Sequence, residues 1–172
     1  MDKIIPLVFL FHTDLDSVAI VWFLKDGAVK IMEIIISNPQ FSAEQRVAVR
    51  YPFSNFSGCK KVIQLSEKIK RYCQGKNEKF ALDMFDFEGI PKFRKDVYFA
   101  LFKTERGETL SYGELAIISG YPFAARAVGT AMKNNPFPFV IPCHRVIRSD
   151  GSLGGFFGAE EIKKKLIEME KS

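Results

Sequence analysis

Three closely spaced prolines are the feature that most restricts what this chain can fold into. They are Pro136, Pro138 and Pro142. Each fixes its φ angle and removes an amide donor, so the apolar segment 136–146 is expected to be neither a helix nor a central strand. We therefore predict extended backbone, packed beneath a cleft, that mounts the thiol of Cys143 and the imidazole of His144 rigidly.

Cys143 can be interpreted in two ways. A thiol acts as a nucleophile only as the thiolate, and a histidine with neighbouring arginines is the kind of setting that lowers a thiol pKa. Alternatively, Cys143 is a small buried apolar residue and His144 a surface residue, since free cysteines commonly serve packing. Adjacent side chains of extended backbone point to opposite faces, so a base at His144 would need a bend or a bridging water to reach Cys143.

The composition of the chain limits its class. With 172 residues, 47% of them hydrophobic, it can form one large or two small domains with a real core. Its three cysteines have neither the number of a disulfide framework nor the spacing of a zinc site, so we expect no metal, no cofactor and a cytoplasmic location, or a nuclear one in a eukaryote. No apolar run approaches the ~20 residues of a membrane span, and none resembles a cleaved signal sequence.

The positive charge is unevenly distributed along the sequence. The net charge is +5, and residues 91–158 carry nine basic against five acidic residues. Residues 1–90 and 159–172 are close to balanced. A polyanionic partner for the part of the chain that contains Cys143 is therefore plausible, although ordinary surfaces also show such an excess.

Residues 1–88 are predicted to form an α/β domain. The alternating apolar run 18–36 is interrupted by Asp26-Gly27, which can supply the positive φ angles of a hairpin turn. His12 lies near two aspartates, but a solvated loop is the better interpretation than a metal site. Nothing in this part of the chain has the pattern of a catalytic site.

The same domain is expected to contain two helices and a further strand. Ser42 and Gln45 form a capping box at the start of one helix. Ser57 is expected to cap the second helix, whose apolar face also places Cys73 in the core. The alternating residues 80–84 predict a strand.

A second, mainly helical domain is predicted over residues 91–172. Pro91 is expected to begin a helix that runs to about Thr104. Ser111 and Glu114 form another capping box, which predicts a short helix from residue 112.

A turn at 120–122 separates that short helix from a helix predicted over 123–133. Helix, short glycine turn, helix is the pattern of a helix-turn-helix, although many helical hairpins bind nothing. Arg126 is the only charged residue between Tyr121 and Met132. On an alanine-rich helix it is either a solvated surface residue or a side chain directed at a partner.

Four sequence segments together resemble the O6-alkylguanine-DNA alkyltransferase family. They are Ser111-Tyr112, Ala124-Ala125-Arg126-Ala127-Val128-Gly129, Asn134-Asn135-Pro136 and Ile141-Pro142-Cys143-His144-Arg145-Val146-Ile147. Their order and spacing are similar to those of the family over residues 91–172. The resemblance implies an RNase H-like α/β domain at the N-terminus and a mainly helical C-terminal domain with a helix-turn-helix.

The resemblance also implies a reaction and the roles of four residues. The family moves an alkyl group irreversibly from O6 of guanine to its own cysteine. By this resemblance Cys143 is the nucleophile and His144 a base that acts through a water. Glu170 would orient His144, and Tyr112 would donate to the leaving O6. The expected partner is double-stranded DNA that contains O6-alkylguanine, bound by a monomer away from any membrane.

Further residues are implied to bind DNA or to shape the pocket. The DNA-binding residues would be Arg126, Tyr112, Ser111, Ala125, Ala127, Gly129 and Arg145, with Arg126 replacing the flipped base in the stack. Asn135 would link the DNA-binding helix to the cysteine segment, and the Cys143 and Val146 carbonyls would bind the exocyclic amine. Gly154, Phe156 and Phe157 would belong to a lid. Phe156 stands where many members have tyrosine, and Phe157 where serine is frequent.

Two other functions share parts of this pattern. A non-catalytic lesion sensor would keep the helix pair and Arg126 but normally lacks the acceptor thiol, so Cys143 argues against it. A helix-turn-helix regulator with a reactive cysteine would need a dimerisation segment, and the chain offers no obvious one.

Overall fold

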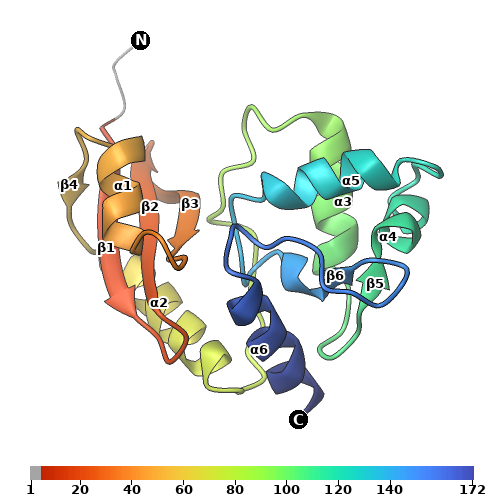
Figure 1. Ribbon diagram of the computed structural model, residues 1–172. Helices are drawn as coiled ribbons and strands as arrows, with labels where there is room; N and C mark the ends of the chain where they lie inside the picture. Colours follow the sequence, from red (N-terminus) through yellow and green to blue (C-terminus); the bar gives the residue numbers. More distant parts are fainter. Residues whose placement is uncertain (1–4) are drawn as a thin grey trace. The chain divides into compact units, whose positions relative to one another are not determined.

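The computed structural model describes residues 5–172, and the chain divides into two compact units between Asp86 and Phe87 (Figure 1). The first unit combines a sheet with helices and the second is mainly helical, which confirms the predicted mixed α/β class. No helix within residues 5–172 is long and apolar enough to cross a membrane.

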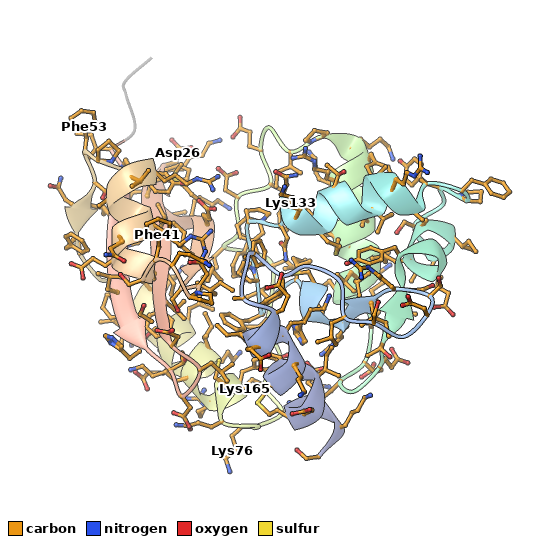
Figure 2. All side chains as sticks on the ribbon, viewed as in Figure 1. Asp26, Phe41, Phe53, Lys76, Lys133 and Lys165 are labelled. Carbon is orange, nitrogen blue, oxygen red and sulfur yellow. The ribbon has the colours of Figure 1, made fainter. Side chains whose placement is uncertain are left out.

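The first unit is built on a four-stranded sheet with the order β3-β2-β1-β4 (Figure 1). Its strands are β1 (Leu7–His12), β2 (Ser17–Lys25), β3 (Ala28–Ile36) and β4 (Asn55–Phe56). The hairpin of β2 and β3 turns as predicted at Asp26 and Gly27, with φ angles of 51° and 75°. Asp26 is labelled at this turn in Figure 2. Residues 17–23 of β2 are buried, so this strand forms the centre of the unit.

Helices α1 (Ala43–Arg50) and α2 (Lys60–Cys73) complete the first unit. The predicted capping box of Ser42 and Gln45 is present at the start of α1. The predicted cap at Ser57 is wrong, because the Ser57 amide donates to the Val8 carbonyl at 2.8 Å beside β1. Helix α2 therefore begins later, with Cys59 at its N-cap and no side-chain cap.

The strand predicted over residues 80–84 is also wrong. This segment is irregular and turns before Phe85, which makes a single bridge to Ile31 of β3. Ile31 donates to the Met84 carbonyl and accepts from the Asp86 amide, each at 2.8 Å. The alternating pattern thus marks one point of contact with the sheet instead of a paired strand.

Four α-helices, a 3₁₀ turn and a short parallel ladder form the second unit. They are α3 (Lys92–Phe102), β5 (Leu110–Ser111), α4 (Tyr112–Ile118), α5 (Ala125–Lys133), η1 (Cys143–Arg145), β6 (Val146–Ile147) and α6 (Glu160–Lys171). Tyr98 of α3 is fully buried, and its hydroxyl donates to the Ala131 and Asn134 carbonyls at 2.9 and 3.1 Å. This buried tyrosine ties α3 to the end of α5.

The boundaries of these helices differ in detail from the prediction. The capping box of Ser111 and Glu114 is present. Pro91 is the N-cap of α3 and not its first residue, and α3 ends at Phe102. Helix α5 begins two residues later than predicted because Phe123 has a φ of +71°, which no α-helix accommodates.

Candidate active site

The proline segment is folded into turns, so the prediction of extended backbone is wrong. Pro142 has φ −78° and ψ 63°, and the Cys143 amide donates to the Ile141 carbonyl at 2.7 Å. These values describe an inverse γ-turn, which the fixed φ of proline favours. The 3₁₀ turn Cys143–Arg145 follows at once. The prolines therefore brace a sharp change of direction that sets the cysteine at the start of a helical turn.

Asn135 holds the cysteine in place. Its Nδ2 donates to Cys143 Sγ at 3.1 Å and to the Ile141 carbonyl at 2.9 Å, while its Oδ1 accepts from the Phe137 amide at 3.0 Å. Cys143 and Asn135 are each only 3% exposed. One buried amide thus connects the end of α5 to both sides of the proline-braced turn.

The environment of the thiol differs from the prediction. Burial raises the pKa of Cys143 to about 11, against smaller lowering effects of Asn135 and of the positive charge on Lys163. The prediction that nearby cations lower the thiol pKa is therefore wrong. Removal of the thiol from water disfavours the thiolate more than these groups favour it. At neutral pH the resting side chain is a thiol, so a base must take its proton during any reaction.

His144 contacts the carboxylate of Glu170. His144 Nε2 lies 3.0 Å from Glu170 Oε1, and the side chains are 0% and 2% exposed. Burial lowers the pKa of His144, an effect that Glu170 opposes, so the imidazole is neutral at pH 7. A carboxylate at Nε2 favours the tautomer that carries its proton there. Nδ1, which is also buried, is then the nitrogen that can accept a proton.

Arg145 is paired inside the protein, which corrects its assignment as a DNA-binding residue. Its Nε and Nη2 donate to Glu170 Oε2 and Oε1, both at 2.8 Å, and its Nη1 donates to the Thr104 carbonyl at 2.6 Å. Arg145 is only 8% exposed. Two donors of the guanidinium hold the carboxylate that contacts His144. Arg145 therefore orients Glu170 inside the protein.

Cys143 lies in the wall of a pocket of about 400 Å³. Its lining residues are Tyr112, Gly129, Met132, Lys133, Cys143, Gly155, Phe156, Phe157, Gly158 and Glu160. Lys133 is labelled at the end of α5 in Figure 2. A cavity of this size is suited to a small organic group such as a single base.

Gly154 leaves the space that the Tyr112 side chain needs at the pocket. A Cβ on Gly154 would lie 2.5 Å from the Tyr112 hydroxyl, and Gly154 also has a φ of +68°. A Cβ on Gly129 of α5 would lie 3.9 Å from the same ring, an ordinary van der Waals distance, so the ring does not require a glycine there. Burial raises the pKa of Tyr112, so its hydroxyl remains a donor at neutral pH.

Phe156 and Phe157 form the aromatic side of the pocket. Their rings meet edge to face with centroids 5.1 Å apart, and the Phe156 ring is perpendicular to His144 at 6.5 Å. Phe156 is buried, whereas Phe157 is half-buried and has a φ of +53°. The hydroxyls that tyrosine and serine would bring to these positions are thus replaced by apolar surface.

Lys163 is a site residue that sequence reasoning missed. It is 0% exposed, and its Nζ donates to the Val146 carbonyl at 2.6 Å and to the Leu153 carbonyl. The buried residues of α6 are Lys163, Leu166, Ile167 and Glu170. Lys163 therefore occupies the Val146 carbonyl that was expected to bind a guanine amine, and Val146 does not line the pocket.

The remaining predicted DNA-binding residues lie on the α4–α5 helix pair, residues 112–133. Arg126 and Ala127 are exposed on α5. Ala125, Gly129 and Ser111 are half-buried, and Ser111 is the N-cap of α4. One side of α5 therefore offers small side chains and a single exposed arginine.

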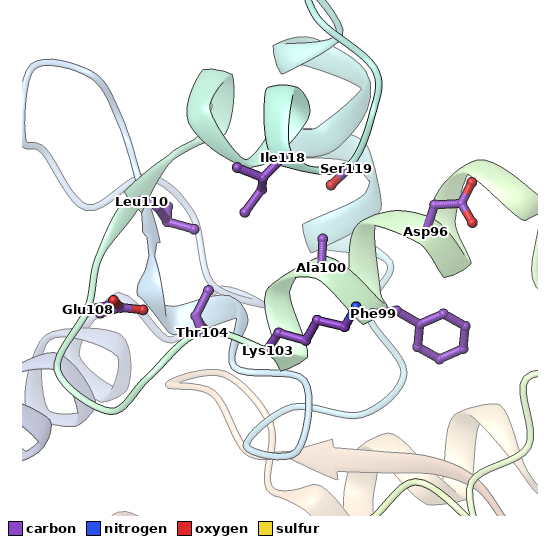
Figure 3. A pocket seen from close by; sticks show the side chains of 9 residues that line it. All are labelled: Asp96, Phe99, Ala100, Lys103, Thr104, Glu108, Leu110, Ile118 and Ser119. Carbon is purple, nitrogen blue, oxygen red and sulfur yellow. The ribbon is translucent and has the colours of Figure 1, made fainter.

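A larger pocket of about 540 Å³ in the same unit has different chemistry. Figure 3 shows its lining side chains around α3 and α4: Asp96, Phe99, Ala100, Lys103, Thr104, Glu108, Leu110, Ile118 and Ser119. They include no thiol and no imidazole. Within residues 5–172 no three His, Cys, Asp or Glu side chains are grouped as metal ligands. Of these two pockets, the smaller one is the one lined by Cys143.

Comparison with known proteins identifies the family. The model of the 6-O-methylguanine DNA methyltransferase DNA-binding domain matches residues 92–172. A methylated-DNA–protein-cysteine methyltransferase of Methanosarcina barkeri is 41% identical over 109 residues, which are 63% of this chain and 68% of that protein. The chain belongs to the methylated-DNA–protein-cysteine methyltransferase family. Every residue of the pocket described above lies within the matched domain.

The likeness to other family members extends to the fold. The Methanothermobacter thermautotrophicus member is 40% identical over 63% of this chain, a segment that spans 61% of that relative. The structure of the O6-methylguanine methyltransferase of Mycobacterium tuberculosis has a TM-score of 0.77 at 26% identity, and the match covers 97% of this chain and 93% of that one. An OGT from the same organism, solved in complex with DNA, has a TM-score of 0.76 at 28% identity, with coverages of 96% and 92%.

Proposed function

We propose that this protein repairs O6-alkylguanine in double-stranded DNA by taking the alkyl group onto Cys143. The observation that carries the proposal is the position of Cys143, which lines a base-sized pocket together with Tyr112, Phe156 and Phe157. The names of the relatives support the reaction class. The DNA complex of the M. tuberculosis protein supports DNA as the partner.

The resting protonation states define the order of proton transfer. Cys143 begins as a thiol and His144 as a neutral imidazole. The S–H proton passes, through a water, to His144 Nδ1, and Glu170 stabilises the imidazolium at Nε2. Arg145 keeps Glu170 ionised and oriented throughout.

The alkyl transfer is an in-line displacement at a saturated carbon. The sulfur electron pair forms the S–C bond, and the electrons of the broken C–O6 bond remain on O6 of guanine. Tyr112 donates a hydrogen bond to that oxygen, which its protonated hydroxyl is able to do. The bonds of Asn135 fix the sulfur in the orientation that such a displacement needs.

The product explains a single turnover. A thioether has no good leaving group and is not one of the reversible oxidation states of cysteine. One protein molecule therefore repairs one lesion. Nucleophile, base, pocket and helix pair all come from one unit of one chain, so a monomer is sufficient.

Access to O6 requires the damaged base to leave the stack. Extrusion has an unfavourable free energy of a few kcal/mol, which contacts with the opened duplex must offset. Helix α5 enters the minor groove, and the exposed Arg126 takes the place of the extruded guanine. Small residues on α5 permit close approach without strict sequence readout.

Mass spectrometry tests the proposal. The protein is mixed with a duplex that contains one O6-methylguanine, and the intact mass and the Cys143 peptide are measured. We expect a gain of one methyl group in place of one hydrogen on Cys143, at one methyl per protein. Cys143→Ser and an undamaged duplex are the controls. A protein that binds the lesion tightly and stays unmodified would instead be a sensor.

A further inference from the structure

Phe123, in the turn between α4 and α5, is exposed to an unusual degree. Its relative exposure is 103%, the highest among the exposed large hydrophobic residues of the described range 5–172, and its φ is +71°. Both features oppose stability, since a phenyl ring in water is unfavourable and the left-handed region is rare for bulky residues. A position that combines the two is a candidate for a functional role.

The turn has the hydrogen bond and the proline of a type II turn, but a residue that is unusual for its third position. The Ala124 amide donates to the Tyr121 carbonyl at 3.1 Å, Pro122 occupies the second position and Phe123 the third. The third position of a type II turn requires a positive φ and ordinarily takes glycine or asparagine. A phenylalanine here fixes an exposed ring where a flexible glycine would be the unstrained choice.

The turn is anchored to α3, so the exposed ring has a rigid mount. The Tyr121 hydroxyl donates to Asp96 Oδ2 at 2.5 Å, and the Tyr121 ring meets the Phe93 ring edge to face at 4.8 Å. The Tyr121 amide also donates to the Ala116 carbonyl of α4 at 2.9 Å. Three contacts therefore hold the residue two positions before Phe123.

Phe123 lies in the turn that leads into α5 and is exposed like one side of that helix. On this side Arg126 and Ala127 lie four and three residues before Thr130, the spacing of one helix face, and all three are exposed. Lys133 adds a second exposed cation to that side. The exposed side of α5 and the turn before it thus combine positive charge with an aromatic ring. This combination is complementary to a polyanion that also offers stacked bases.

We propose that Phe123 is an apolar wedge that inserts into, or stacks on, a base step beside the one opened by Arg126. The inference rests on the proposed function, because that function supplies duplex DNA as the partner of α5. Minor-groove proteins commonly unstack a base step with phenylalanine or another apolar side chain. Because the turn that carries Phe123 is already held by Tyr121, little backbone freedom is lost when the ring inserts, which favours binding.

Duplex affinity tests the wedge in the Cys143→Ser background, where no transfer can change the complex. Phe123→Gly relieves the positive φ and should fold at least as stably as the parent. Loss of a base–aromatic stack should weaken binding to an O6-methylguanine duplex by roughly 5- to 150-fold. Phe123→Trp should retain most of the affinity. Binding by Phe123→Gly within twofold of the parent would overturn the proposal.

Two further measurements distinguish the loss of a wedge from a nonspecific loss of duplex affinity. With 2-aminopurine beside the lesion, the fluorescence increase on binding should be smaller for Phe123→Gly, and an equal increase contradicts the wedge. The salt dependence of binding should keep its slope, because no charge is removed. Phe53→Ala removes another exposed phenylalanine, 79% exposed and labelled in Figure 2, and should leave the affinity unchanged. An equal loss in that control also overturns the proposal.

The failure of the wedge and of the proposed function can be distinguished. If the Cys143 protein gains no methyl group from damaged DNA, alkyl transfer is refuted whatever Phe123 does. If transfer occurs and Phe123→Gly binds, distorts and repairs the duplex like the parent, the wedge alone is refuted.

Discussion

Asn135 Nδ2 donates to Cys143 Sγ at 3.1 Å inside the protein. The same amide group bonds the backbone on both sides of the proline-braced turn. The contact that fixes the sulfur is therefore also part of the structure that fixes the turn, and the position of the sulfur depends on the packing of α5 against this segment.

Asn135→Ala should therefore affect both stability and transfer. It leaves a buried carbonyl and a buried amide without their partner, so the free energy of unfolding should fall by about 2 kcal/mol or more. It also removes a group that lowers the pKa of Cys143, which should slow alkyl transfer. Urea unfolding and single-turnover rates check this. Asn134→Ala, at an exposed neighbour whose side chain donates to the Thr130 carbonyl of its own helix, should change neither greatly.

Arg145→Ala should be more damaging than the loss of an exposed arginine. It leaves the buried Glu170 carboxylate without its bidentate partner, and breaking such a pair typically destabilises by about 3–5 kcal/mol. Thermal unfolding measures the change. Arg148→Ala, at an exposed position after β6, is the matched control and should be nearly neutral. Equal losses in both variants would contradict the internal role of Arg145.

Stability should fall on acidification through a window set by His144. Burial lowers its pKa in the folded protein, whereas the unfolded chain has the ordinary value of about 6.5. Below that value the unfolded chain binds the extra proton first, so the contribution of His144 is complete above about pH 6.5 and is lost as the pH falls toward the folded pKa. Thermal melts across this pH range should show a melting temperature that decreases as the pH is lowered.

The same protonation should limit the reaction. A protonated His144 cannot accept the thiol proton, so the acid limb of the transfer rate should lie below about pH 6.5. His144→Gln should flatten the acid slope of stability, whereas His12→Gln, at the exposed end of β1 in the first unit, should preserve it. An acid limb centred clearly above pH 6.5 would refute the depressed pKa of His144.

Gly154→Ala should disable the pocket through a clash. The new methyl group would lie 2.5 Å from the Tyr112 hydroxyl and would force that ring away. Gly151→Ala is the matched control, because Gly151 also has a positive φ but no atom lies within 4 Å of the new Cβ. Both variants should show backbone strain of about 1 kcal/mol, and only Gly154→Ala should also lose transfer.

Lys163→Met should loosen the lid. The variant preserves much of the packing volume but leaves the Val146 and Leu153 carbonyls without their donor, which should destabilise by roughly 1–3 kcal/mol. Amide hydrogen exchange should increase in residues 153–158. Lys164→Met, on the exposed side of α6, should leave that exchange as it is. Unaltered exchange in both variants would mean that other contacts hold the lid.

Local sequence signals predicted the parts of the fold that depend on neighbouring residues. Both capping boxes and the Asp26-Gly27 turn are present because each is a bonding pattern of a few adjacent residues. The cap at Ser57 failed because its amide is used by a strand distant in sequence. A pattern confined to one segment carries no information about such a partner.

The candidate site shows the same limit. The resemblance directed attention to Cys143, His144 and Glu170, but not to the pairing of Arg145 or the burial of Lys163. A lysine on an amphipathic helix ordinarily lies on the solvated face, and only the carbonyls of β6 and the lid provide it with buried partners. The raised pKa of Cys143 was likewise beyond the sequence, because it follows from burial and not from neighbouring residue types.

Burial of the sulfur also governs which reagents can inactivate the protein. Cys143 and Cys73 are buried with pKa values raised to about 11 and about 12, whereas Cys59 is partly exposed. Oxidants and small thiol-modifying compounds in the surrounding solution therefore encounter Cys59 first. Under the proposed function the acceptor is used once, and burial of its sulfur limits its reaction with molecules other than the damaged base.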